Sequence, residues 1–289
     1  MLIDPLARVT TQALSPVPRR RLSSRPPILV TLAALWLLVL TALAFGISFI
    51  PGIDPRATDY NNLVAAPSLG HLFGTDNLGR DVFVRTMFGA QASIMIAALV
   101  IVVGGGAGLL LGVIGGYLRG PFDAIIGFAT DVLMALPALL LVITVVTLRG
   151  PSLLTIGLIL AILAIPAFSR IARAATRSVT RSPYVVAART LGASPLRIML
   201  REVLPAVVPI VTPFALTAIA SAIIAEGAMS FLGFGLQPPA PSWGGLIADG
   251  RSQLASAPWV TMLPAAVLCG TILAVNVIGE HLRKESGRQ

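Results

Sequence analysis

Six long apolar stretches constrain this chain more than any other feature of its sequence. They lie at residues 28–50, 92–118, 124–148, 151–169, 203–225 and 256–279. A helix needs about 20 apolar residues to cross the hydrocarbon core of a bilayer, and each stretch is close to that length. With 56% hydrophobic and 11% charged residues, the chain also has too few polar groups to cover a soluble globule. We therefore predict an all-α membrane protein with six transmembrane helices.

The distribution of positive charge predicts the orientation of these helices. With the N-terminus placed inside, the cytoplasmic segments hold 16 of the 21 Lys and Arg residues, and the outer segments hold the other five. Cytoplasmic segments close to membrane spans are enriched in Lys and Arg. We therefore predict that both termini are cytoplasmic, with tails at residues 1–27 and 283–289. The first tail is expected to be flexible or bound to anionic lipid.

The net charge of +9 does not indicate a nucleic acid partner. Nearly all the positive residues are arginines at the ends of apolar runs. Proteins that bind nucleic acids instead show basic patches, often interleaved with aromatic residues. We therefore expect no nucleic acid among the partners of this chain.

Residues 51–91 form the longest predicted outer loop. Asp76 and Asp81 lie near Arg80 and Arg85 in this loop. Ion pairs and the capping of turns are the common use of such a cluster, and a catalytic role is the rarer alternative. We expect the structural use.

Residues 227–255 begin with a stretch that is uncharged enough to compete as a seventh span. The glycines and prolines of this stretch argue against it, because such a backbone cannot face lipid without hydrogen-bond partners. A seventh crossing would also place the basic C-terminal tail outside. We predict a re-entrant or outer-surface segment that packs on protein. It belongs to a permeation core at residues 92–282, which contains five of the six spans.

Glycines recur every four residues in the second apolar stretch, at Gly104, Gly108, Gly112 and Gly116. This spacing lines one face of a helix with a groove that lets another helix approach closely. A phosphate-binding loop is the competing interpretation, but such a loop requires a lysine after its glycines. The only lysine of the chain is Lys284. Any ATP used with this chain is therefore expected to bind another polypeptide, and no cofactor is expected here.

No catalytic residue and no metal site can be selected from the sequence. His71 and His281 fall on opposite sides of the membrane in the predicted topology, and no spacing of His, Cys and carboxylates matches a metal site. Neither histidine lies in a span where it could activate a serine or threonine. The single cysteine, Cys269, excludes an internal disulfide, and we expect it to be a small buried apolar residue.

Two acidic residues lie in or beside the apolar stretches, Asp131 in the third and Glu226 directly after the fifth. Ionisable groups are costly at membrane depth and usually face protein or a water-filled cavity. These two could relay protons or bind a substrate amine. We favour a structural role instead. In that role each is protonated, or hydrogen-bonded to backbone near a helix break such as Pro137 or Gly227.

The predicted cytoplasmic loop 170–204 carries the most informative local pattern. Ser182 and the proline after it form a good N-cap and first turn, residues 184–191 suffice for about two turns of helix, and Gly192 supplies a stop. Ser194 and its proline then begin a second helix that leads into the next span. A short helix at this place cannot cross the membrane. It can only lie on the surface or enter a groove of a partner.

At these residues the chain resembles the permeases of binding-protein-dependent ABC importers. The cytoplasmic loop of that family contains Glu-Ala-Ala, three residues, Gly and later Leu-Pro. The matching residues here are Ala187, Ala188, Gly192, Leu204 and Pro205. By this resemblance, the helix that couples such a permease to its ATPase is built from Tyr184, Val186, Ala187, Ala188, Arg189, Gly192, Ala193, Ser194 and Pro205.

One residue departs from the family pattern. Val186 stands where the family usually has glutamate, so one ion pair expected with the ATPase is missing. Arg189 is the nearby charge that could compensate for it.

Three longer motifs resemble, more narrowly, the C-type permease of dipeptide and oligopeptide importers. They lie at residues 72–81, 230–235 and 237–244. The resemblance covers the chain from about the first span to the C-terminus. It implies the type I ABC importer permease fold, with six transmembrane helices and a cytoplasmic coupling helix.

The same resemblance implies the partners and location of the chain. The partners are a homologous second permease subunit, two cytoplasmic ATPase subunits that bind ATP and Mg²⁺, and an extracytoplasmic substrate-binding protein. The chain would then be a non-catalytic, multi-pass subunit of the bacterial cytoplasmic (inner) membrane. It would form half of the translocation pathway for dipeptides or oligopeptides.

Two other classes of function stay open at the level of sequence. An ion-coupled secondary transporter would use Asp131 and Glu226 as a relay and would often show inverted repeats, for which we find no convincing signal. A membrane scaffold without transport would need none of the loop motifs. Related permeases serve dipeptides, longer peptides, glutathione, nickel complexes and haem-like ligands. The permease sequence does not separate these cargoes, because selection largely occurs on the binding protein.

Overall fold

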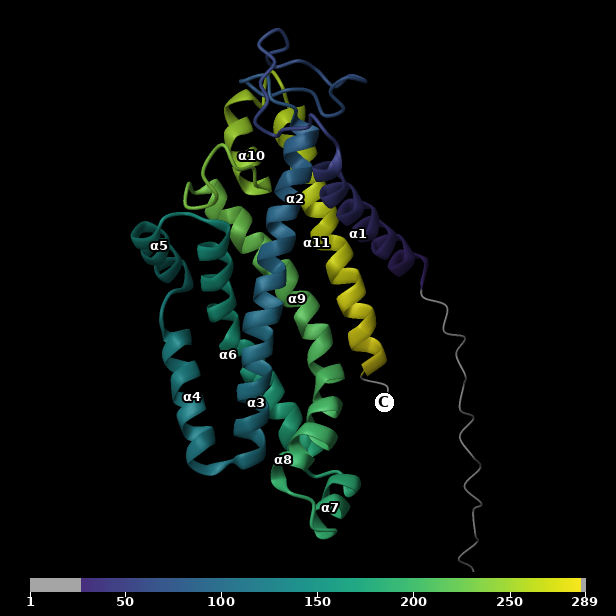
Figure 1. Ribbon diagram of the computed structural model, residues 1–289, viewed down its shortest axis with the longest axis vertical. Coiled ribbons are helices and arrows are strands. Elements are labelled where there is room, and N and C mark those ends of the chain that lie inside the picture. The colour runs from purple at the N-terminus through teal and green to yellow at the C-terminus, as the bar shows by residue number, and fades with distance from the viewer. Residues whose placement is uncertain (1–26, 287–289) are drawn as a thin grey trace, which may run out of the picture.

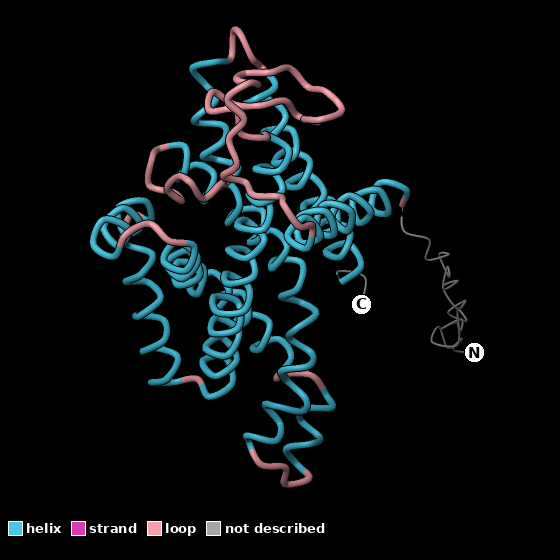
Figure 2. Tube along the Cα trace, turned by 45° about the horizontal axis from the view of Figure 1, so that its top comes forward, coloured by secondary structure: helices cyan, strands magenta, loops and turns pink. Residues whose placement is uncertain are grey.

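The computed structural model describes residues 27–286, which form helices joined by loops and, within this range, no β-strand (Figures 1 and 2). The predicted tails therefore lie largely outside the described residues. The helices are α1 (Ile28–Gly46), η1 (Ile47–Phe49), α2 (Val82–Leu99), η2 (Val100–Gly105), α3 (Gly106–Leu118), α4 (Gly120–Ala135), α5 (Ala138–Arg149), α6 (Leu153–Val179), α7 (Pro183–Thr190), α8 (Pro195–Ile198), η3 (Met199–Val203), α9 (Leu204–Phe231), α10 (Trp243–Gly250), η4 (Arg251–Gln253) and α11 (Trp259–Ser286).

Five helical segments among the described residues are long and apolar enough to cross a bilayer. They overlap the first, second, fourth, fifth and sixth predicted stretches. The third stretch corresponds to α4 and α5, which give a sixth span if this bent pair is counted as one. The all-α membrane class is therefore confirmed. The five segments are Ile28–Phe49, Val82–Leu118, Leu153–Val179, Pro195–Phe231 and Trp259–Glu285.

The third predicted stretch is not one straight helix. Helices α4 and α5 meet at an angle of 80°. Pro137 disfavours helical backbone at the residue before it, and Leu136 accordingly has an extended conformation with ψ of 131°. The prediction of a continuous span at residues 124–148 is therefore wrong in its geometry.

The second and fifth spans are longer than their apolar stretches. Helix α2 begins at Val82, ten residues before the expected start, because the side chain of Asp81 caps it by accepting the N–H of Val84. Six residues of π-helix, η2, then join α2 to α3. Helix α9 continues to Phe231, so the first residues of the predicted outer segment 227–255 belong to a span. The rest of that segment packs on protein through α10, where Trp243 is fully buried.

The two ends of the molecule differ in what they carry. At one end lie the loop between α1 and α2 and the short helix α10, and at the other lie α7 and α8 (Figure 1). A core cluster that includes Phe168, Val185 and Val207 joins α3, α6, α7 and α9. A second cluster, which includes Met87 and Trp243, joins α1, α2, α9, α10 and α11.

Candidate functional site

The short helix predicted after Ser182 is present as α7, and its end residues explain its limits. Pro183 is its first residue, after Ser182 in an extended conformation whose side chain makes no capping hydrogen bond. At the other end Gly192 has φ of +81°, a left-handed conformation that glycine adopts without strain. The N–H of Ala193 then donates to the carbonyl of Ala188 at 3.1 Å and closes the helix end.

Helix α7 has a buried side and an exposed side. Val185 is fully buried against the core, with Ile198 and Val203 of the following helix in the same cluster. Tyr184 and Val186 are about half exposed on the other side. The remaining predicted coupling residues divide in the same way, with Ala188 and Ala193 half-buried and Ala187, Arg189, Gly192, Ser194 and Pro205 exposed.

Two further apolar residues of this surface escaped the sequence analysis. Leu191 is 86% exposed and Leu196 is 61% exposed, on either side of Gly192. Large apolar side chains exposed together are typical of a surface that a partner covers. The sequence did contain a signal for this surface, because both leucines are large apolar residues in a loop predicted to be outside the membrane. We call Tyr184, Val186, Leu191 and Leu196 the α7 surface.

The four glycines spaced at intervals of four all face α6. A Cβ atom on Gly104, Gly108 or Gly112 would lie 2.5 Å from an atom of α6, and one on Gly116 would lie 2.8 Å away. Real Cβ atoms do not approach this closely. The stripe is therefore filled by a neighbouring helix, which leaves no room for the competing phosphate-binding interpretation.

Glu226 is completely buried, among serine hydroxyls from two further helical elements. Ser93 of α2 donates to its carboxyl group at 3.2 Å, and Ser230 of α9 donates at 2.8 Å. Ser242, the N-cap of α10, donates to Ser230 at 3.0 Å. Hydroxyl groups, and not the backbone near Gly227, are thus the hydrogen-bond partners of this carboxyl group. The network ties α2, α9 and α10 together.

Asp131 is exposed, with 70% of its side chain accessible, and accepts a hydrogen bond from Arg170 of α6 at 3.2 Å. Its partner is therefore an arginine. A backbone partner was one of the two alternatives considered from the sequence. Asp123 makes a second contact between the same helices, 3.3 Å from Arg173. Two acidic residues of α4 thus hold this helix along α6.

Two cavities lie along α9 and share Phe214 and Thr217. The larger, of about 740 Å³, extends toward the C-terminal end of α11 and is lined there by Glu280 and Arg283. The smaller, of about 290 Å³, lies between η2, α6 and α9 and is lined mostly by alanine and leucine, together with exposed Ser221. Phe214 packs edge-to-face on Phe168 at a centroid distance of 4.9 Å. We call the two cavities together the α9 groove.

Comparison with known proteins identifies the family. Residues 108–284 match the family described as binding-protein-dependent transport system inner membrane component. The chain belongs to this family. The glutathione transport system permease protein GsiD of Escherichia coli O6:K15:H31 (strain 536 / UPEC) is 38% identical over 252 residues, which cover 87% of this chain and 83% of that protein. GsiD of Shigella boydii serotype 4 (strain Sb227) gives the same values.

Family membership establishes the general role of the chain. It is a multi-pass inner-membrane permease subunit of an ABC importer. It is not itself an enzyme, because in this family the ATPase resides in partner subunits. The prediction of an importer permease is therefore confirmed.

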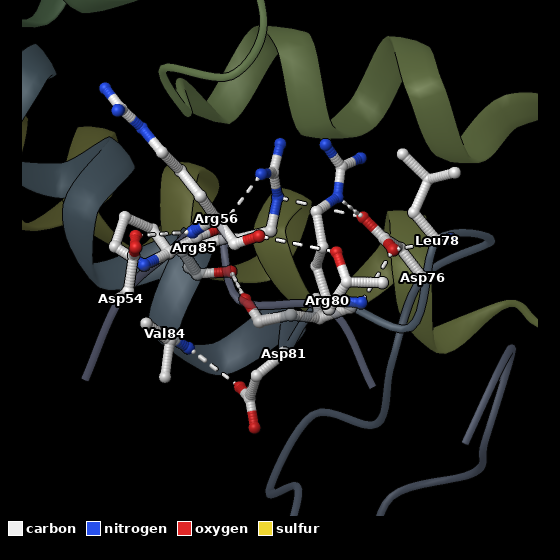
Figure 3. Close-up of polar contacts among 12 residues, drawn as sticks. Asp54, Arg56, Asp76, Leu78, Arg80, Asp81, Val84 and Arg85 are labelled. Carbon is white, nitrogen blue, oxygen red and sulfur yellow. Dashed lines mark hydrogen bonds and ion pairs between the residues drawn. The ribbon is translucent and has the colours of Figure 1, made fainter. Parts of the chain in front are cut away.

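The charged cluster in the loop between α1 and α2 of the permease has the structural use that its sequence favoured (Figure 3). The carboxylate of Asp76 accepts from Nε of Arg80 at 2.7 Å and from the N–H of Leu78 at 2.9 Å. Asp81 caps α2 through the N–H of Val84 and also contacts His71 at 2.8 Å. These bonds fold the loop over the end of α2.

Cys269 of the permease is exposed on α11, so the prediction of a buried residue is wrong. Apolar character alone does not distinguish a buried position from one that faces lipid. Within residues 27–286, no three His, Cys, Asp or Glu side chains are grouped as a metal ion would require.

Proposed function

We propose that the permease carries peptides along the α9 groove, as half of a pathway completed by a homologous permease subunit. The observation that carries this proposal is the junction of the two cavities at Phe214 and Thr217. Thr217 and Ser221, one turn apart on α9, are exposed residues that carry hydroxyl groups. Helix α1, by contrast, exposes mainly leucine and other apolar residues. Polar groups within spans face water or protein, so the α9 groove favours a hydrated pathway over lipid.

The α7 surface is proposed as the contact with a cytoplasmic ATPase. Its exposed apolar residues suit a groove on a partner, and Val185 anchors the helix to the core behind them. Val186 provides an apolar contact where the family has a glutamate, and exposed Arg189 supplies a charge beside it. Two such ATPase subunits would bind ATP and Mg²⁺, and this chain would bind no cofactor.

The proposed cargo is a short peptide delivered by an external substrate-binding protein. The similarity to GsiD permeases supports a cargo of the size and chemistry of glutathione. Uptake of glutathione should be measured in right-side-out vesicles that hold the whole complex, with the loaded binding protein outside. We expect uptake with ATP trapped inside and none with an ion gradient alone. Uptake driven by the gradient without ATP would replace this proposal with a secondary transporter.

Phe214 should limit the width of the α9 groove, because both cavities are lined by it. We expect Phe214→Trp to lower ATP-driven uptake about tenfold. The larger ring would overpack the groove and raise the barrier to passage by roughly 1–2 kcal/mol. The matched control is Phe128→Trp on the exposed side of α4, which lines neither cavity and should transport normally. Normal uptake by Phe214→Trp at normal membrane levels would move the pathway away from this groove.

Orientation is proposed from the charge split, with both termini and α7 cytoplasmic and the loop between α1 and α2 outside. We expect a cysteine at exposed Ser68 to react with a membrane-impermeant thiol reagent in intact cells, and a cysteine at exposed Ser178 to react only after lysis. Both are made in a Cys269→Ala background, since the native cysteine is exposed. The reverse labelling pattern would invert the topology.

A further inference from the structure

A small cavity of about 260 Å³ lies near the end of α9 that is farther from α7. It is enclosed by the start of α2, the end of α9, the following loop and α10. Its lining includes three buried polar residues, Arg85, Ser230 and Ser242. Exposed Gln237 and Asp249 also line it. The cavity thus has buried polar residues on one side and exposed residues at its opening. We call it the Arg85 cavity.

Arg85 has unused capacity to bind an anion. Its side chain is only 2% exposed. Its Nη1 donates to the carbonyl of Pro55 at 3.2 Å, whereas its Nε is 3.8 Å from Asp76 and has no hydrogen-bond partner. A guanidinium offers five N–H donors. A buried donor without a partner is costly, so a ligand that accepts from Arg85 would be stabilised.

Asp76, the neighbouring acidic residue, does not neutralise the charge of Arg85. Asp76 is held at 2.7 Å by Nε of Arg80, whose guanidinium lies beside that of Arg85 (Figure 3). Arg80 does not line the cavity. The hydroxyl protons of Ser242 and Ser230 point along the chain of hydrogen bonds toward Glu226. Among the cavity's charged residues, Arg85 is therefore the one group suited to a carboxylate.

Asp249 gives the cavity a second charge of opposite sign. It is exposed, lines the same cavity as Arg85, and makes no ion pair within 4 Å among the described residues. A bare anion would be repelled by this carboxylate, whereas an ammonium group would be attracted. The pair therefore favours a ligand that carries both charges close together.

We propose that the Arg85 cavity binds a zwitterionic amino-acid head group, with the carboxylate on Arg85 and the ammonium on Asp249. This inference rests on the proposed peptide cargo. The two ends of an ordinary peptide carry these charges apart from each other, but a γ-glutamyl residue carries both on one carbon. The cavity thus selects γ-glutamyl peptides such as glutathione. It binds their head group, while the rest of the peptide lies outside the cavity.

The test uses the transporter purified with its partner subunits, without the binding protein. Thermal unfolding is followed with millimolar glutathione and with glutathione acetylated at its γ-glutamyl amine. Binding to the folded state raises the unfolding temperature. We expect a rise with glutathione and a much smaller one with the acetylated form. Arg85→Gln should abolish the rise, since loss of a charged hydrogen bond weakens binding about tenfold or more.

Two further variants keep the outcome clear if Arg85→Gln fails to fold. Exposed Asp249→Asn should bind glutathione and the acetylated form equally weakly. Arg56→Gln, the loss of an exposed arginine in the loop before α2 that does not line the cavity, should keep the response to glutathione. If the wild-type complex shows ATP-driven uptake but no rise with glutathione, or if Arg56→Gln loses the rise as Arg85→Gln does, this inference is wrong and the transport function stands. Absence of ATP-driven uptake of every peptide would instead remove the proposed function.

Discussion

Replacing Gly112 with leucine is expected to remove the permease from the membrane. A Cβ atom at this position would lie 2.5 Å from the carbonyl oxygen of Ser169 and 2.6 Å from Cβ of Ala172. Neither atom belongs to a flexible chain end, so α3 and α6 would have to move apart. Overpacking of a tight core typically costs about 1–3 kcal/mol, and this contact involves backbone, so we expect the upper end or more. Membrane levels are measured by immunoblotting, and stability by unfolding in detergent.

Gly106→Leu is the matched control for this prediction. Gly106 lies in the same helix, and a Cβ atom there would meet nothing within 4 Å. Leucine is also a better helix former than glycine, so the substitution should be neutral or slightly stabilising. Equal levels for the two variants would show that the glycine stripe does not set the distance between α3 and α6.

Replacing Gly192 with valine is expected to leave the protein in the membrane and to abolish transport. The residue has φ of +81°, and a β-branched residue pays about 1–2 kcal/mol for a left-handed backbone. A Cβ atom there would meet nothing within 4 Å, so the damage is confined to the conformation of the turn. Helix α7 should fray or tilt, which would spoil the fit of the α7 surface. Uptake should collapse, and ATP hydrolysis by the complex should no longer respond to the loaded binding protein.

Gly150→Val provides a control with at least as much backbone strain. Gly150 has φ of +83° and ψ of 153°, a region that is essentially restricted to glycine, and it too has nothing within 4 Å of a Cβ atom. It lies between α5 and α6, away from α7. We expect near-normal uptake from this variant. Coupled transport by Gly192→Val at the rate of Gly150→Val would disprove the role of α7 in coupling.

The features that could be predicted from sequence were those encoded by neighbouring residues. Helix α7 could be predicted because Ser182, Pro183 and Gly192 mark its ends locally. The glycine stripe could be predicted because a spacing of four places residues on one helix face. Neither inference needed knowledge of any other part of the chain.

The features that were missed depend on distant residues or on the surroundings of a proline. Ser93 and Glu226 are 133 positions apart, and nothing local pairs them. Pro137 was recognised as a possible break, yet apolar content alone gave one continuous span, because hydropathy is insensitive to a change of helix direction. The Arg85 cavity combines residues of α2, α9 and α10, which only the folded chain brings together.

The helix that follows Gly192 connects the two ends of the molecule. It runs without interruption from Pro195 to Phe231, and 37 residues at 1.5 Å each make it about 55 Å long. Its π-helical turn η3 and Pro209 lie in the half nearer α7, and Pro213 lies at its midpoint. Its far tip, Phe231, lines the Arg85 cavity. If α7 moves with an ATPase as proposed, a slight tilt at this end of the helix is expected to give a larger displacement at its far end, with no relay of side chains between the two.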